Sequence, residues 1–216
     1  MIYYHEVFRT IQGEGYDSGE PVTFIRLYGC NVKCVYCDQP QTRDDKKKTS
    51  VTKLVDKVRR FSLSGNVCIT GGEPLVQEEV YPLIYELVNL GYKVSIETNG
   101  TIKLANYEEK LRSYKYIMDV KCPSSGVSKH NKFENLEILQ GHDEVKFVIG
   151  TREDYDYAKK VLKNYPTKAK LLFSPMFDEN NKTHIGKDLC NWLLEDNFNY
   201  GQYKVQIQIH KIIGVQ

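Results

Sequence analysis

Short runs of β-branched and aromatic residues recur along the chain, each bounded by glycine, proline or polar residues. Runs of this kind are typical of β-strands. The pattern predicts strands at 22–29, 66–70, 93–98, 116–121, 145–150, 169–174 and 203–210.

Segments with apolar residues three and four positions apart lie between several of these runs, and this spacing indicates helices. In 51–61 an apolar face begins just after Thr49 and Ser50, either of which can cap the helix. The helical pattern at 78–91 ends in Gly91, as helices commonly do. Further helices are expected at 154–166 and 187–198, whereas 123–143 is poorly periodic and indicates a loop with a short helix at 133–139.

Strands that alternate with helices favour a parallel sheet joined by right-handed crossovers. At 216 residues the chain fits a single domain over 1–216, and about six strand-helix units are too few for a closed eightfold barrel. An open doubly wound sheet and an incomplete barrel both fit this pattern. In either architecture, ligands bind where the C-terminal ends of the strands meet the following loops.

Composition narrows the environment in which the protein is expected to work. Apolar residues make up 41% of the chain and charged residues 27%, as in soluble globular proteins. The net charge of +2 gives no electrostatic footprint for direct binding of nucleic acid. The N-terminus lacks the regions of a signal peptide, and no apolar run reaches the ~20 residues of a membrane span. We therefore expect a cytoplasmic protein with reduced thiols and no membrane partner.

Half of the six cysteines fall in one short segment, CNVKCVYCD at 30–38, directly after the first expected strand. Cys30, Cys34 and Cys37 can present three sulfurs to one compact object. A [4Fe–4S] cube has four irons, so three thiolates leave one iron open to a substrate or cofactor. The spacing therefore favours an iron–sulfur cluster with an open position.

A zinc-stabilised binding module is the non-enzymatic alternative for this loop. Structural zinc requires four ligands, and no fourth Cys or His lies within several residues of the three cysteines. Cys68, Cys122 and Cys190 each stand alone in an apolar segment and are expected to be buried, because free cysteine is among the most buried residue types.

A second motif, Gly-Gly-Glu-Pro at 71–74, follows the strand expected at 66–70. Its glycines let the backbone approach a ligand closely. Together with the C-x3-C-x2-C loop, this motif resembles the radical S-adenosylmethionine (SAM) superfamily. The resemblance implies that the methionyl amine and carboxylate of SAM chelate the open iron. An electron from the cluster would then cleave SAM to a 5′-deoxyadenosyl radical.

Flanking segments narrow the resemblance over nearly the whole chain. They are similar to the 7-carboxy-7-deazaguanine synthase family, a group of carbon–nitrogen lyases of queuosine and 7-deazapurine biosynthesis. This family implies an incomplete TIM-type barrel of about six parallel βα units. The implied reaction contracts 6-carboxy-5,6,7,8-tetrahydropterin to 7-carboxy-7-deazaguanine with loss of ammonia. The segments are FRTIQGEG (8–15), FIRLYGC (24–30), ETNGT (97–101), DVKCPSSG (119–126), SPMF (174–177) and QIQIHKIIGVQ (206–216).

The resemblance also implies which residues bind the pterin. Arg26 would hold its carboxylate, because a guanidinium matches that group. His210 follows an alternating run, so the sequence alone leaves its side chain facing either the site or water. The implied set is Ile11, Gln12, Gly13, Glu14, Arg26, Thr70, Thr98, Asn99, Thr101, His210 and the C-terminal carboxylate of Gln216.

Cofactor residues follow from the same resemblance. Where family members place Thr or Ser two residues after the last cluster cysteine to bind Mg²⁺, this chain has Gln39, and Thr42 is a possible substitute. Mg²⁺ prefers charged or water oxygens, so this departure bears on the magnesium site. The implied SAM residues are Tyr36, Cys37, Asp38, Gly72, Glu73, Asp119, Lys121, Ser174, Pro175, Met176 and Phe177.

A different enzyme class shares the cysteine loop, namely the activases that generate a glycyl radical on a partner protein. An activase needs a large exposed surface for that partner, whereas QGEG, Arg26 and QIHK indicate an enclosed pocket for a small molecule. The family resemblance further implies a homodimer and a reducing partner such as flavodoxin or ferredoxin.

Overall fold

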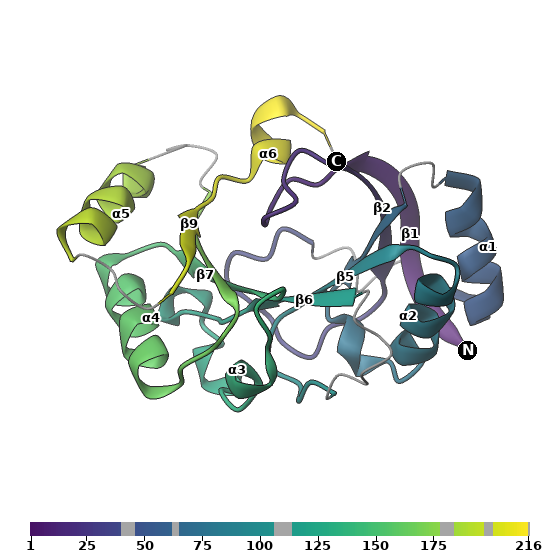
Figure 1. Cartoon of the computed structure of the whole chain (residues 1–216), viewed down its shortest axis with the longest axis horizontal. Helices are drawn as coiled ribbons and strands as arrows, with labels where there is room; N and C mark the ends of the chain where they lie inside the picture. Colours follow the sequence, from purple (N-terminus) through teal and green to yellow (C-terminus); the bar gives the residue numbers. More distant parts are fainter. Residues whose placement is uncertain (40–45, 62–64, 106–113, 178–183, 197–200, 216) are drawn as a thin grey trace.

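The computed structural model describes residues 1–39, 46–61, 65–105, 114–177, 184–196 and 201–215, and its strands form one curved sheet (Figure 1). The sheet has nine strands in the order β3-β1-β2-β4-β5-β6-β7-β8-β9. The bounds are β1 (Ile2–Ile11), β2 (Pro21–Leu27), β3 (Lys47–Thr49), β4 (Asn66–Gly71), β5 (Lys93–Thr98), β6 (Tyr114–Asp119), β7 (Glu144–Ile149), β8 (Lys170–Pro175) and β9 (Tyr203–Val205).

From β2 to β9 every neighbouring pair is parallel, whereas β1 pairs antiparallel with both β2 and β3. The sheet curves into an open arc, and the larger helices lie on its outer side (Figure 1). This confirms the incomplete barrel. The helices are α1 (Val51–Phe61), α2 (Val80–Asn89), α3 (Asn135–Ile138), α4 (Arg152–Asn164), α5 (His184–Glu195) and α6 (Ile209–Ile213), with 3-10 turns η2 (Pro74–Val76), η4 (Pro123–Ser125) and η5 (Ser128–His130).

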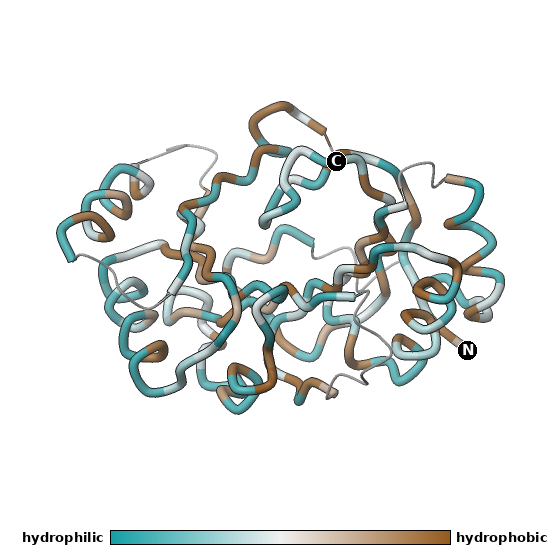
Figure 2. The backbone as a smooth tube through the Cα atoms, viewed as in Figure 1, coloured by the Kyte–Doolittle hydropathy of each residue, from teal (hydrophilic) through white to brown (hydrophobic). Residues whose placement is uncertain are grey.

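The outer face of the arc carries the main apolar core, whereas the inner face combines charged side chains with a small apolar cluster of Val22, Phe24 and Cys68. On β7, Val145, Phe147 and Ile149 are fully buried in the main core with residues of α4, whereas Glu144 and Lys146 carry charge on the same strand. Apolar residues along the strands alternate with hydrophilic ones in Figure 2. We call the space enclosed by the inner face the lumen.

The open side of the arc is closed by two segments that are far apart in sequence. The loop 12–20 joins β1 to β2 and projects into the lumen beside α6 (Figure 1). There Gly13 O accepts a hydrogen bond from Ile209 N at 3.1 Å, and Gly15 N donates to Gln206 Oε1 at 2.6 Å. These contacts bridge the gap between β1–β2 and the end of the chain.

The elements agree with most of the sequence predictions. The helix expected at 133–139 is α3, and Thr151 caps α4 with a capping box closed by Asp154. None of the described helices is both long and apolar enough to cross a membrane.

Three features differ from the sequence predictions. The strands β1 and β3 were not predicted. The run 203–210 was expected to be one strand, but the strand ends at Val205 and α6 begins at Ile209, because Gln206 and Gln208 turn inward toward Glu14. Cys190 was expected to be buried, but it is exposed on the outer face of α5, whereas Cys68 and Cys122 are buried.

Candidate functional site

The three-cysteine loop follows β2 at the C-terminal end of the parallel strands, where ligands were expected. It has little regular structure and is fixed by backbone hydrogen bonds to two other loops. Val35 N donates to Ser125 O at 3.0 Å, and Gly29 O accepts from Glu73 N at 2.8 Å. Backbone hydrogen bonds therefore hold the loop in place, and all three cysteines stay partly exposed.

Cys30, Cys34 and Cys37 share one neighbourhood. Burial raises the pKa of the Cys34 thiol; the positive charge of Lys121 opposes this, and Asp119 and the two other cysteines add to it. Among the described residues, no three His, Cys, Asp or Glu side chains converge closely enough to hold a single metal ion. The electrostatic interactions of Cys34 with Cys30 and Cys37 bring the three sulfurs near one another, as three thiolate ligands of one [4Fe–4S] cube must be.

The glycine turn after β4 lies directly against the cysteine loop. A Cβ atom on Gly72 would lie 2.2 Å from Gly29 O and 2.7 Å from Cys30 Cβ. Only glycine allows this approach, which brings the turn and the first cysteine together. The turn therefore borders the cluster position, as a SAM-binding role requires.

Glu73 is fully buried, and its carboxylate accepts hydrogen bonds from other groups of the protein. It accepts hydrogen bonds from Thr98 Oγ1 at 2.8 Å, Asn99 N at 2.6 Å and Leu75 N at 3.0 Å. Burial raises its pKa, while these hydrogen bonds act in the opposite direction. Glu73 and Thr98, predicted to bind cofactor and substrate, thus join the ends of β4 and β5 to each other.

Asn99 and Thr101 extend this network to the cysteine loop. Asn99 Nδ2 lies 3.8 Å from Cys30 Sγ and donates to Asn31 Oδ1 at 3.1 Å. Asn31 Nδ2 donates in turn to Thr101 Oγ1 at 2.8 Å. Asn31 was not predicted, because an asparagine in a loop has no distinctive spacing. The predicted substrate residues at the end of β5 therefore also fix the first cysteine.

Two buried polar atoms near the cysteines lack a partner among the described residues. They are the Tyr36 hydroxyl and Asp119 Oδ1. The other oxygen, Asp119 Oδ2, accepts from Lys121 Nζ at 2.7 Å. Burial raises the pKa of Tyr36, and the negative charge of Asp119 raises it further. Unpaired buried polar atoms commonly mark a ligand position, and here they fit the predicted SAM residues.

The predicted segment 174–177 lies at the end of β8. Met176 N donates to Ile149 O at 2.8 Å, and Ser174 is almost fully buried. Lys211 of α6 lies 5.1 Å from the centre of the Phe177 ring and pairs with Asp38 Oδ2 at 3.3 Å. The predicted cofactor residues Asp38 and Phe177 are thereby brought together through α6.

The opposite end of the lumen is a floor built by the loop 12–20. Glu14 accepts hydrogen bonds from Lys146 at 2.7 Å, Gln206 at 3.3 Å and Gln208. Burial raises the pKa of Glu14, but Lys146, Gln208 and His210 outweigh it and hold the pKa at about 2. Glu14 is therefore a carboxylate at neutral pH.

His210 faces inward, which settles the orientation that the sequence left open. A Cβ on Gly13 would lie 1.9 Å from His210 Nδ1, so the imidazole rests on the backbone of this glycine. Ile11 is the last residue of β1 and pairs with Pro21. The predicted group Ile11 to Glu14 and His210 thus share the floor.

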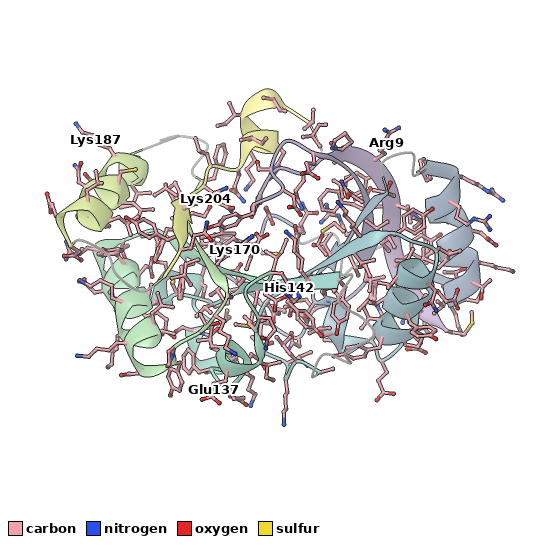
Figure 3. All side chains as sticks on the ribbon, in the orientation of Figure 1. Arg9, Glu137, His142, Lys170, Lys187 and Lys204 are labelled. Carbon is pink, nitrogen blue, oxygen red and sulfur yellow. The ribbon has the colours of Figure 1, made fainter. Side chains whose placement is uncertain are left out.

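A second charged cluster contacts the loop 12–20 around Tyr16. Tyr16 N donates to Glu144 Oε2 at 3.1 Å, and Glu144 also pairs with Lys115. Lys170 and Lys204, labelled in Figure 3, hold their ammonium groups 4.8 and 4.0 Å from the centre of the Tyr16 ring. These contacts fix the loop 12–20 at the N-terminal end of the lumen.

Arg26 and Thr70 occupy paired positions on β2 and β4. Arg26 Nε donates to Glu6 Oε1 at 3.0 Å, and its guanidinium lies 5.4 Å from the centre of the Phe8 ring. Thr70 Oγ1 donates to Glu97 Oε2 at 2.8 Å, and Gln12 Nε2 lies 3.4 Å from the other oxygen of Glu97. Glu97 therefore joins two predicted substrate residues, although the sequence reasoning did not include it in the site.

The residues predicted to bind magnesium and the predicted C-terminal carboxylate lie at or beyond the limits of the described segments. Gln39 follows the cysteine loop and is half-buried. Thr42 and Gln216 lie outside the described residues.

Comparison with known proteins gives one consistent result. The family model described as Radical SAM superfamily matches residues 24–184. A 7-carboxy-7-deazaguanine synthase from Methanospirillum hungatei is 40% identical, covering 97% of this chain and 84% of the relative. One from Koribacter versatilis is 39% identical, covering 96% and 95%. The crystal structure of QueE from Escherichia coli shares the fold, with a TM-score of 0.73 and 24% identity over 95% of this chain and 93% of that one. The chain belongs to the 7-carboxy-7-deazaguanine synthase family of the radical SAM superfamily.

Proposed function

We propose that this protein is a 7-carboxy-7-deazaguanine synthase that contracts 6-carboxy-5,6,7,8-tetrahydropterin to 7-carboxy-7-deazaguanine with loss of ammonia. The observation that carries the proposal is the pairing of an open cysteine loop with a polar lumen, in a chain 40% identical to a relative of that name. Cys30, Cys34 and Cys37 would hold a [4Fe–4S] cluster, which with SAM would supply the hydrogen-abstracting radical.

The residues of the chain hold the pterin and exclude water. A carboxylated pterin presents one carboxylate and an edge of alternating donors and acceptors. Glu14 and Gln12 offer acceptors and a donor from the floor. Arg26 uses its Nε for Glu6, and the other N–H groups of its guanidinium suit the substrate carboxylate. His210 adds an imidazole at the floor. The pterin ring would then lie between the floor and the cysteine loop.

Positioning is the main contribution of this site to the reaction. The floor is fixed in place by ion pairs and hydrogen bonds between the loop 12–20 and the strands. Asp119 Oδ1 and the Tyr36 hydroxyl offer an acceptor and a donor at the cofactor end. Holding both reactants in fixed orientation is how such a site lowers the barrier when a cofactor performs the bond chemistry.

The finer assignments are part of the same proposal. Mg²⁺ would bind substrate oxygens with the amide oxygen of Gln39 or the hydroxyl of Thr42 as protein ligand. The Gln216 carboxylate would contact the pterin. We further propose that the protein is a homodimer and that flavodoxin or ferredoxin reduces its cluster. A cytoplasmic location fits the partly exposed cysteines and the cluster, which require a reducing compartment.

Anaerobic turnover tests the proposed function. The cluster-loaded protein is mixed with the carboxylated pterin, SAM, dithionite and Mg²⁺, and the product is followed by mass spectrometry. We expect 7-carboxy-7-deazaguanine and ammonia to form. Glu14→Gln, which keeps the shape of the side chain but loses its charge, should raise the pterin KM about tenfold. SAM cleavage without any deazaguanine would refute this substrate while leaving the superfamily intact.

A further inference from the structure

Lys146 projects from the middle of β7 into the lumen between the two ends of the site. Its Nζ lies 2.7 Å from Glu14 Oε2 and 3.8 Å from Asp119 Oδ2. Glu14 belongs to the floor, whereas Asp119 is the last residue of β6, beside the cysteine loop. One ammonium group therefore contacts a residue of the pterin side and a residue of the SAM side.

The surroundings of Lys146 are strongly acidic. Burial lowers its pKa, but Glu14, Asp119 and Glu97 together outweigh burial and raise the pKa well above the usual value. Asp119 also pairs with Lys121 at 2.7 Å, which extends the chain of alternating charges to the cysteine loop. Without the Lys146 charge, three carboxylates would face one lumen with much less compensation, which favours their displacement or protonation.

The position of Lys146 is rigid. It pairs with Asp119 in the register of β6 and β7, and its carbonyl accepts a hydrogen bond from Val120 N at 2.8 Å. Its strand lies between β6 and β8 and is anchored on the outer face by Phe147, which stacks on Phe173 with ring centres 5.6 Å apart. A charged group on such a strand is held more accurately than one on a loop.

We propose that Lys146 is a positioning residue that orients Glu14 toward the pterin and Asp119 toward SAM at the same time. This proposal rests on the proposed function. Lys146 then does more than neutralise charge, because this one side chain sets the distance between the bound pterin and the bound SAM. Substrate and cofactor binding are therefore coupled through this residue, although it touches the reacting atoms of neither.

The first measurement needs no pterin. The dissociation constant of SAM is determined for the reduced, cluster-loaded protein from the change that SAM causes in its electron paramagnetic resonance (EPR) spectrum. Lys146→Met, which has a similar shape but no charge, should weaken SAM binding about fivefold through the displaced Asp119. Lys160→Met, an exposed lysine on α4, is the matched control and should leave the constant unchanged.

The second measurement uses turnover. In Lys146→Met the pterin KM should rise about tenfold, and the fraction of SAM cleavages that yield deazaguanine should fall, because the two reactants are no longer aligned. Lys146→Arg keeps the charge in a longer, planar group and should give intermediate values in both measurements. If Lys146→Met does not fold, the arginine variant alone carries the test.

The two proposals fail in different ways. If the wild-type protein cleaves SAM but makes no deazaguanine, the proposed function fails, and the SAM-binding measurement still decides whether Lys146 orients Asp119. If folded variants of Lys146 bind SAM as the wild type does and keep its KM and its product per SAM cleaved, Lys146 only neutralises charge and the positioning role is wrong.

Discussion

The outer and inner faces of the same strands differ in chemistry although both are largely buried. On the outer face, Phe147 and Phe173 stack in an apolar core with no exposed surface. On the inner face, Lys146 and Glu14 form an ion pair next to Asp119. A parallel sheet covered on both sides normally has apolar residues on both faces. The charged inner face therefore indicates a lumen built for a polar ligand.

This difference separates stability from function along each strand. Apolar contacts of the outer face hold the arc against α1, α2, α4 and α5, and they supply the stability that charged groups in the lumen reduce. The charges of the inner face are compensated by ion pairs, as between Lys146 and Glu14, or by hydrogen bonds, as between Glu97 and Thr70. Substitutions on the two faces should therefore have different consequences, and the expected effects below run from the largest to the smallest.

The largest effect is expected where the inner face meets the cysteine loop. Cys34→Ala removes one of three cluster ligands and should reduce bound iron from about four per chain to almost none, with complete loss of product. Iron and sulfide analysis after anaerobic reconstitution measures this. Cys190→Ala, on the outer side of α5, is the control and should keep both iron and activity. A cluster-loaded, active Cys34→Ala protein would remove the basis of the site.

The next effect belongs to the outer face. Phe147→Ala should lower the free energy of unfolding by about 3–5 kcal/mol, because a fully buried ring is lost from the stack with Phe173. Urea titration of the apoprotein measures the change. The fraction that remains folded should bind the pterin with a KM within about twofold of wild type. A large change in KM without loss of stability would show that the two faces are not separable in this way.

Acid unfolding tests the inner face alone. The pKa of Glu14 is lowered from 4.5 to about 2, so its charge stabilises the folded state above about pH 4.5. This contribution, up to about 3 kcal/mol, is lost as the pH falls toward 2. In Glu14→Gln the free energy of unfolding should therefore fall less steeply over this interval. Parallel titration curves for the two proteins would mean that Glu14 is not held by Lys146 in solution.

The sequence predicted the outer face well because period and residue type determine it. The alternating runs from 22 to 174, the helical spacings and the cysteine loop after β2 lie where they were expected. The strand β1 was missed because IYYHEVFRTI mixes polar and aromatic residues without a clear alternation. The prediction for the end of the chain was wrong because the alternation in KVQIQI is typical of a strand. In the structure Gln206 and Gln208 instead donate hydrogen bonds to Glu14.

The inner face was predicted only where motifs mark it. Gln12, Glu14 and Arg26 were identified from the family resemblance, and the structure gathers them around the lumen. Lys146 and Glu97 were missed, because a polar residue that alternates with apolar ones has the same pattern whether it faces water or a closed lumen. Only the three-dimensional pairing of β6 with β7 and the inward loop 12–20 distinguishes these cases.

The account depends on a cluster that has one open iron facing the lumen, and EPR of the reduced protein tests this most directly. After anaerobic reconstitution, about four irons and four sulfides per chain are expected, and adding SAM without pterin should shift the spectrum. One zinc per chain, or a cluster whose spectrum is the same with and without SAM, would contradict it.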